Sequence, residues 1–216
     1  MQGRPRALLF DWDDTLADNW RAIHRATNAT LAAMGQPTQS YETTRRTVRR
    51  SMRDTFPKRF GDRWREAMEV FYATYRAEHL ETLTALPGAD AMLNAAGQRG
   101  RYLAVVSNKT GAILRAEAAQ LGWTDHFAEI VGAGDAVRDK PSPEPVTMAL
   151  GRSGITPAWD VWFVGDSPLD MECAAAAGCR PVLIRDDPPT ADQFGDWMPD
   201  LHVTDCAALT AILATV

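Results

Sequence analysis

The stretch ALLFDWDDTLADNW, residues 7–20, decides the fold of this chain. Four apolar residues, 7–10, run directly into Asp11, Asp13 and Asp14. A short apolar run without helical periodicity is typical of a buried strand in a parallel sheet. Because an unpaired buried carboxylate is costly, aspartates crowded at the end of such a strand predict either a bound cation or a chemical role.

The composition narrows the class of protein. The chain has 216 residues, 45% of them apolar, and a net charge of −5, so we expect a globular protein that does not bind nucleic acid. Three cysteines without metal-ligand spacing argue against a disulfide framework or a zinc site and favour the cytoplasm. The first apolar run is too short for a signal peptide or a membrane span, so we expect no membrane partner. The sequence gives no indication of the oligomeric state.

Further apolar runs and helical patterns alternate along the rest of the chain. The runs RYLAVVSN, EIVGAG, DVWFVGD and RPVLIRD predict strands within 101–108, 129–134, 160–166 and 180–186. Helices are predicted over 109–121, 143–153, 168–177 and the final apolar segment. The third has Ser167 as N-cap, Pro168 at its first position and Gly178 as its stop signal. This alternation predicts an α/β fold with a doubly wound, Rossmann-like parallel sheet.

Residues 18–86 interrupt the alternation. They contain no convincing strand, but three amphipathic patterns predict helices over 19–34, 41–53 and 62–80. We therefore expect residues 1–17 and 87–216 to form the α/β core, with 18–86 inserted after the first strand as a small helical domain.

Polar residues follow several of the predicted strands. In an open parallel sheet, ligands bind beyond the carboxyl ends of the strands. The residues expected there are Asp11, Asp13, Ser107, Asn108, Lys140, Asp166 and Asp170. Asp11, Asp13 and Asp166 would repel one another unless a cation neutralised them, and Mg²⁺ prefers such oxygen ligands. Only three of the 23 basic residues are lysines, so a lysine at this edge of the sheet is notable.

Four motifs resemble those of the haloacid dehalogenase (HAD) superfamily and occur in the same order. They are DWDDTL at 11–16, VVSN at 105–108, DKPSPEP at 139–145 and VGDSPLDMECAAAAG at 164–178. The helical insert is similar to the C1-type cap of the phosphoglycolate phosphatase-like branch of that superfamily. The resemblance covers essentially the whole chain, and it implies a Mg²⁺-dependent phosphatase acting on a small phosphorylated metabolite.

The resemblance also implies roles for the four aspartates. Asp11 would attack phosphorus and carry a transient aspartyl phosphate. Asp13 would protonate the leaving oxygen and then activate water. Asp11, Asp166 and the main-chain carbonyl of Asp13 would bind the metal, with Asp170 in the outer shell of that site, where it would hold water or Lys140.

Three further residues are implied in substrate binding and charge stabilisation. Ser107 and the backbone N–H of Asn108 would bind a phosphoryl oxygen, while Lys140 would stabilise the charge shared by Asp11 and the phosphate. Many relatives have Gly where this chain has Asp14, although Asp tolerates the left-handed conformation better than most residues. Trp12, between two aspartates, is expected to act through its backbone.

An arginine-rich run, RRTVRRSMRD at 45–54, lies in the insert. Within a helix over 41–53 it would place Arg45, Arg49 and Arg53 on one face. Such a run is usually a solvated face. The sharper hypothesis is that Arg49, Arg50 or Arg53 binds a second anionic group of the substrate.

Other functions remain open at this point. A phosphomutase would use the same motifs, whereas a haloacid dehalogenase has no use for the metal cluster and typically lacks an aspartate at the position of Asp13. A phospho-aspartate signalling or binding module is a further alternative, although response-regulator receivers have no helical insert after the first strand. Phosphoglycolate is the substrate expected from the resemblance, with nucleoside monophosphates and sugar phosphates as alternatives.

Overall fold

The computed structural model describes residues 4–216, which form two compact units. One unit contains residues 4–17 together with Ala85–Val216, and the other contains Asp18–Thr84. A two-stranded sheet of β2 (Ala17–Asp18) and β3 (Thr84–Ala85) lies where the chain passes from one unit to the other. We call the first unit the core unit and the second the helical unit.

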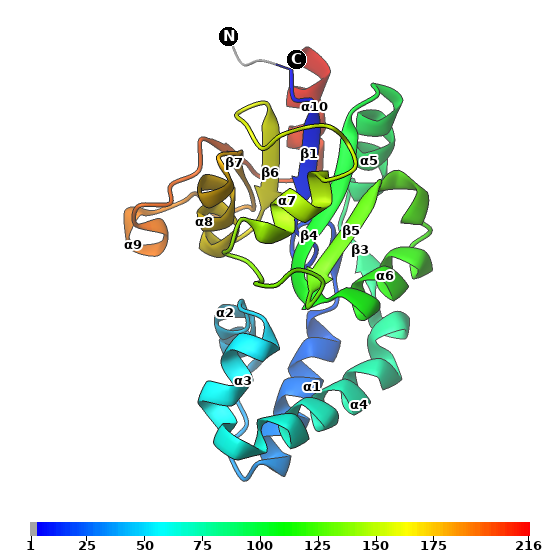
Figure 1. Ribbon diagram of the computed structural model, residues 1–216. Coiled ribbons are helices and arrows are strands. Elements are labelled where there is room, and N and C mark those ends of the chain that lie inside the picture. Colours follow the sequence, from blue (N-terminus) through cyan, green and yellow to red (C-terminus); the bar gives the residue numbers. More distant parts are fainter. Residues whose placement is uncertain (1–3) are drawn as a thin grey trace. The chain divides into compact units, whose positions relative to one another are not determined.

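A six-stranded sheet forms the centre of the core unit (Figure 1), and its strand order is β5-β4-β1-β6-β7-β8. All five neighbouring pairs are parallel. The strands are β1 (Ala7–Phe10), β4 (Tyr102–Thr110), β5 (Glu129–Ala133), β6 (Val161–Gly165), β7 (Arg180–Ile184) and β8 (Leu201–Val203). The doubly wound parallel fold expected from the sequence is confirmed.

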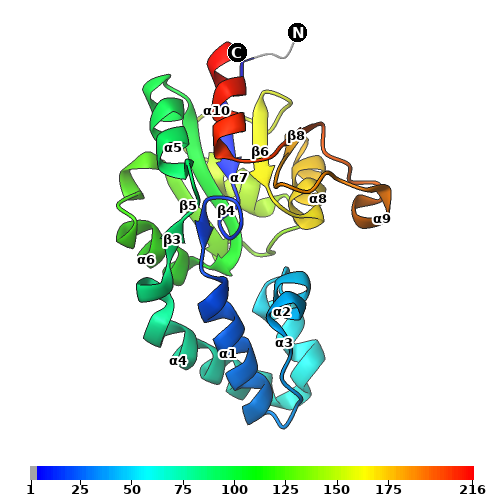
Figure 2. The ribbon, with the colours of Figure 1, turned by 180° about the vertical axis from the view of Figure 1, so that it is seen from behind.

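Helices cover both faces of this sheet. They are α5 (Ala89–Gln98), α6 (Gly111–Gln120), α7 (Glu144–Leu150), α8 (Pro168–Ala177), α9 (Ala191–Phe194) and α10 (Cys206–Thr215), with a 3-10 turn at Thr124–His126. Helices α7 and α8 lie in front of the sheet in Figure 1, while α5 and α10 cover the opposite face, as Figure 2 shows. Strands β1, β6 and β7 are buried along their whole length, which explains why their sequences are continuously apolar.

Local signals account for the boundaries of α8. Ser167 precedes the helix with extended backbone, Pro168 is its first residue, and Gly178 ends it with a φ of 75°. Pro suits the first turn because its missing N–H has no partner there in any helix, and Gly adopts a positive φ without steric cost. The predicted helix over 168–177 is therefore confirmed to the residue.

The helical unit contains four helices, where three were expected. They are α1 (Trp20–Ala33), α2 (Tyr41–Thr47), α3 (Met52–Phe60) and α4 (Trp64–Thr82), with a 3-10 turn at Gly61–Arg63 before α4. The prediction of one helix over 41–53 is wrong. Val48 leaves the helical region with a ψ of 90°, and Ser51 takes the extended conformation of an N-cap residue before α3. Arg45, Arg49 and Arg53 consequently do not share one helical face.

Strand β8 and helix α9, with three and four residues, are too short to give a periodic signal and were not identified in the sequence. Among residues 4–216, no helix combines the length and the apolar character needed to cross a membrane. The three cysteines are buried thiols, and burial raises the pKa of Cys173 to about 12. Cys173 is thus a small core residue, as expected.

Candidate active site

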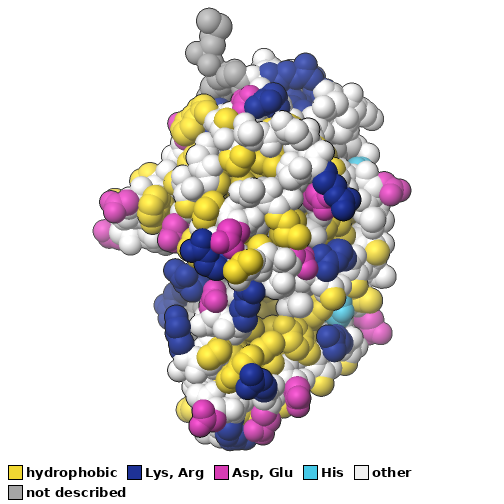
Figure 3. All heavy atoms as spheres, viewed as in Figure 1, with side chains coloured by type: hydrophobic (Ala, Val, Ile, Leu, Met, Phe, Trp, Pro, Cys, Tyr) yellow, Lys and Arg dark blue, Asp and Glu magenta, His cyan; other side chains and the backbone are white. Residues whose placement is uncertain are grey.

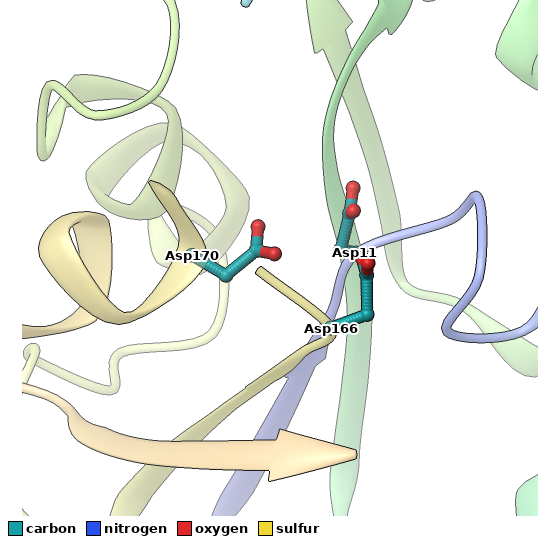
Figure 4. A group of neighbouring side chains, drawn as sticks. All are labelled: Asp11, Asp166 and Asp170. Atoms are coloured by element: carbon teal, nitrogen blue, oxygen red, sulfur yellow. The ribbon is translucent and has the colours of Figure 1, made fainter. Parts of the chain in front are cut away.

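Strands β1 and β6 bring two aspartates together. The two strands are in parallel register, with Phe10 opposite Val164, and the backbone N–H of Asp11 donates to the carbonyl of Val164 at 2.9 Å. Asp11 and Asp166 therefore follow directly from the carboxyl ends of neighbouring strands, as Figure 4 shows. This is the edge of a parallel sheet at which ligands bind.

Asp170 reaches the same place from the first turn of α8. Its Oδ2 accepts hydrogen bonds from the backbone N–H of Ser167 at 3.0 Å and from the Ser167 hydroxyl at 2.6 Å. A Cβ on Gly165 would meet the Cβ and Cγ of Asp170 at 2.4 Å. The absence of a side chain at Gly165 thus lets the helix approach closely enough for Asp170 to face Asp11 and Asp166.

The three carboxylates form a cluster that could hold a metal ion. Asp11, Asp166 and Asp170 each offer an oxygen, and these atoms lie within 4.8 Å of one another. Carboxylate oxygens suit a hard divalent cation such as Mg²⁺. Because both oxygens of Asp170 already accept hydrogen bonds from protein donors, Asp11 and Asp166 are better placed as direct ligands.

Lys140 lies among these carboxylates as a buried ammonium group. Its side chain is 2% exposed, and Nζ contacts Asp11 Oδ1 at 2.8 Å and Asp170 Oδ1 at 2.7 Å. Burial alone would lower the pKa of Lys140, but the two aspartates outweigh that effect and raise it above its ordinary value. Lys140 is therefore a fixed positive charge at neutral pH.

The carboxylate of Asp11 experiences opposing influences. Burial raises its pKa, Lys140 lowers it and Asp170 raises it, with a net upward shift. The charge of Asp11 is thus destabilised by the protein alone, and a cation at the cluster would stabilise it.

Asp13 has its own cationic partner, Lys109, which the sequence reasoning did not identify. Lys109 Nζ contacts Asp13 Oδ1 at 2.8 Å and Glu117 Oε2 at 2.6 Å. The pKa of Asp13 is raised to about 7, because burial, Glu117 and Asp11 together outweigh the lowering effect of Lys109. Two features of the sequence could have identified Lys109: the scarcity of lysine in this chain, and the presence of Glu117 on the otherwise apolar face of α6.

Ser107 and Asn108 lie at the carboxyl-terminal part of β4, close to the Lys140 loop. The Ser107 hydroxyl is almost buried and accepts from the backbone N–H of Lys109 at 3.3 Å. The side-chain amide of Asn108 donates to the carbonyl oxygen of Lys140 at 3.1 Å. Asn108 thereby ties the loop that carries the ammonium to the end of β4.

The turn after Asp11 shows what Trp12 and Asp14 contribute. Asp14 adopts a φ of 61°, so this chain makes a left-handed turn with Asp, a residue that tolerates this conformation better than most residues other than Gly. The carbonyl of Trp12 accepts from the backbone N–H groups of Leu16 and Ala17 at 2.9 and 3.0 Å. The expectation that Trp12 acts through its backbone is incomplete, because its fully buried indole also donates to Glu117 Oε2 at 2.8 Å.

The arginine-rich run at 45–54, which supplied the candidate binders of a second anionic group, belongs to the helical unit. The guanidinium groups of Arg45 and Arg49 lie over the ring of Trp20, at 5.7 and 5.6 Å from its centroid. Arg50 is exposed in the turn between α2 and α3. Several Lys and Arg side chains lie together over this part of the surface in Figure 3. Arg49 has an aromatic contact that holds its side chain against α1.

Comparison with known proteins identifies the family. A model of the family "Haloacid dehalogenase-like hydrolase" matches residues 8–184. The chain is 31% identical over 185 residues to a phosphoglycolate phosphatase of Pectobacterium atrosepticum, covering 82% of this chain and 79% of the relative. It is 29% identical over 209 residues to a phosphoglycolate phosphatase of Xanthomonas campestris, covering 92% of each chain.

Solved structures support the same assignment of fold. A haloacid dehalogenase-like family hydrolase from Streptococcus pneumoniae superposes with a TM-score of 0.83 at 21% identity, covering 97% of this chain and 98% of the other. The resemblance stated from the motifs and the expectation of a HAD-type enzyme are confirmed. The chain belongs to the haloacid dehalogenase-like hydrolase family, as a phosphatase whose curated relatives bear the name phosphoglycolate phosphatase.

Proposed function

We propose that the protein is a Mg²⁺-dependent phosphatase that hydrolyses a small phosphate monoester through an aspartyl phosphate on Asp11. One observation carries this proposal: the carboxylates of Asp11, Asp166 and Asp170 converge within 4.8 Å around the buried ammonium of Lys140. These charged groups lie at the edge of the sheet where ligands bind. Groups that served only to stabilise the fold would not need to be concentrated at that edge.

Asp11 is the nucleophile in this proposal. Lys140 contacts Oδ1 of Asp11, so Oδ2 is the oxygen that attacks phosphorus, and the ammonium neutralises part of the charge that the phosphate brings. Asp170 holds Lys140 from the other side and fixes its direction. Lys140 therefore serves both to lower the repulsion between Asp11 and the substrate and to stabilise the transition state.

Asp13 is the general acid and base. It protonates the oxygen of the leaving alcohol and then accepts a proton from the water that attacks the aspartyl phosphate. Its pKa of about 7 suits both tasks, because neither protonation state is strongly disfavoured near neutral pH. Ser107 and the N–H of Asn108 bind a phosphoryl oxygen at the end of β4.

Asp11, Asp166 and the main-chain carbonyl of Asp13 fit as ligands of Mg²⁺, with Asp170 outside the first coordination sphere. Bound Mg²⁺ supplies positive charge that neutralises the phosphoryl oxygens and relieves the repulsion among the carboxylates. The oxygen-only donor set and the raised pKa of Asp11 both support such an ion.

The names of the curated relatives favour phosphoglycolate as substrate. We propose that the helical unit acts as a cap that closes over the substrate and excludes bulk water. A haloacid dehalogenase is disfavoured because Asp13 would have no role in it, whereas a phosphomutase would use the same residues. The partner of the enzyme in this proposal is the small phosphorylated metabolite. We also propose that the enzyme acts in the cytoplasm, because the three cysteines have no spacing that indicates a disulfide framework.

Phosphate release tests the proposed reaction. The purified protein with Mg²⁺ is screened against phosphoglycolate, nucleoside monophosphates and sugar phosphates. We expect release from at least one monoester, and a loss of at least about 10³-fold in kcat for Asp11→Asn, because the nucleophile is removed. A dependence on added sugar diphosphate, with little net phosphate release, would instead indicate a mutase.

The helical unit's arginines are tested separately as binders of a second anionic group. Arg49→Ala, Arg50→Ala and Arg53→Ala are compared for KM on phosphoglycolate and on an aryl phosphate whose phosphate is its only anionic group. We expect one variant to raise KM on phosphoglycolate about tenfold or more, since a charge-assisted hydrogen bond contributes roughly 1.5–3 kcal/mol. Unchanged KM values in all three variants would rule out this role.

The raised pKa of Asp13 predicts a pH-dependent stability in the metal-free protein. In the folded state Asp13 holds its proton up to about pH 7, whereas in the unfolded chain it loses it near the ordinary value of 3.8. The stability that Asp13 contributes is therefore fully present below pH 3.8 and is lost as the pH rises towards 7.

Urea unfolding with a chelator present, at several pH values, measures this effect against Asp13→Asn, which does not titrate. The free energy of unfolding of the parent protein relative to the variant should fall between pH 4 and 7 and then level off. A difference that rises with pH, or does not change, would contradict the raised pKa.

A further inference from the structure

Asp11 and Asp13 are each held by a separate buried lysine. Lys140 lies between Asp11 and Asp170, and Lys109 lies between Asp13 and Glu117. The side chain of Lys109 is 6% exposed and that of Glu117 is fully buried. The second arrangement repeats the carboxylate–ammonium–carboxylate pattern of the first, yet none of the four motifs accounts for Glu117.

Glu117 is fixed from two directions. Its Oε2 accepts from Lys109 Nζ at 2.6 Å and from the indole N–H of Trp12 at 2.8 Å. Trp12 in turn packs edge-on against Trp123, with ring centroids 5.8 Å apart. A buried tryptophan that donates a hydrogen bond has little freedom to move, so Glu117 gives Lys109 a rigid anchor.

Stability does not explain why these charges are buried. Taking two carboxylates and an ammonium out of water costs free energy that their mutual attraction often fails to recover, and apolar replacements of similar volume are often equally stable. A buried ion pair at this place therefore points to a role in the chemistry. Of the three side chains, Asp13 is the most exposed, at 17%, compared with 6% for Lys109 and 0% for Glu117.

We propose that Lys109, anchored by Glu117 and Trp12, is a positioning residue that fixes the carboxylate of Asp13 for proton transfer to the leaving group. This inference rests on the proposed function. Lys109 occupies Oδ1 of Asp13, which leaves Oδ2 to meet the leaving oxygen. General acid catalysis depends strongly on such placement, because the proton must lie within hydrogen-bond reach of the oxygen that departs.

The test uses two substrates that differ in their need for a general acid. Phenyl phosphate and p-nitrophenyl phosphate have similar shape and no carboxylate, but the nitrophenol is the more acidic leaving group and departs without protonation. The measured quantity is kcat/KM, which reports the steps up to departure of the alcohol. We expect Lys109→Met to lose at least about tenfold more kcat/KM on phenyl phosphate than on p-nitrophenyl phosphate, because mispositioning Asp13 removes part of the roughly 10²–10⁴-fold contribution of general acid catalysis.

A second variant separates positioning from folding. Lys109→Met leaves the buried carboxylate of Glu117 without its counter-charge, so this variant is expected to be less stable. In Lys109→Met/Glu117→Gln the amide oxygen still accepts from Trp12 and the buried charge is gone, so the urea midpoint should recover. The selective loss on phenyl phosphate should remain, because Asp13 is still not held.

Lys58→Met serves as the matched control, since Lys58 is the remaining lysine and is exposed on α3. It should leave both substrates unaffected. An equal loss on both substrates in Lys109→Met, or recovery of activity together with stability in the double variant, would overturn the inference. These outcomes leave the proposed function intact if Asp11→Asn is inactive, whereas a parent protein inactive on every monoester would overturn the function itself.

Discussion

The parallel sheet concentrates negative charge at one edge, and the architecture of this site depends on neutralising that charge. Asp11 and Asp166 follow neighbouring strands and Asp170 joins them from α8, so three carboxylates meet where one alone would be costly to bury. Lys140 provides one positive charge among them. A divalent cation at the same oxygens would complete the balance, and it is this requirement that links the fold to phosphate chemistry.

Backbone geometry and one side-chain hydrogen bond, from Asn108, hold these groups in place. The N–H of Asp11 continues the hydrogen bonding between β1 and β6, Gly165 leaves room for Asp170, and Asn108 ties the Lys140 loop to β4. Each contact is made by an element that the hydrophobic core already fixes. The site is consequently pre-organised, which is the condition under which fixed charges stabilise a transition state effectively.

Local patterns in the sequence were sufficient for five of the six strands of the sheet, for α8 and for the residues at strand ends, because strand ends and helix caps depend on neighbouring residues. They were insufficient where distant residues decide the structure. The partnership of Trp12 with Glu117 spans 105 positions, and no local signal links the two. The break between α2 and α3 was missed for another reason: Ser51 is an N-cap signal, but the arginine periodicity across it resembled a continuous helix.

Trapping the phosphorylated aspartate tests most directly whether Asp11 attacks phosphorus. The protein is mixed with Mg²⁺ and substrate, quenched in acid, reduced with borohydride and digested, and the peptides containing residues 11–14 and Asp166 are analysed by mass spectrometry. An acyl phosphate is reduced to an alcohol, so we expect homoserine at position 11 and unmodified Asp13, with no modification in the absence of substrate. Reduction at Asp13 or Asp166, or no modified peptide during active turnover, would contradict the claim that Asp11 attacks phosphorus.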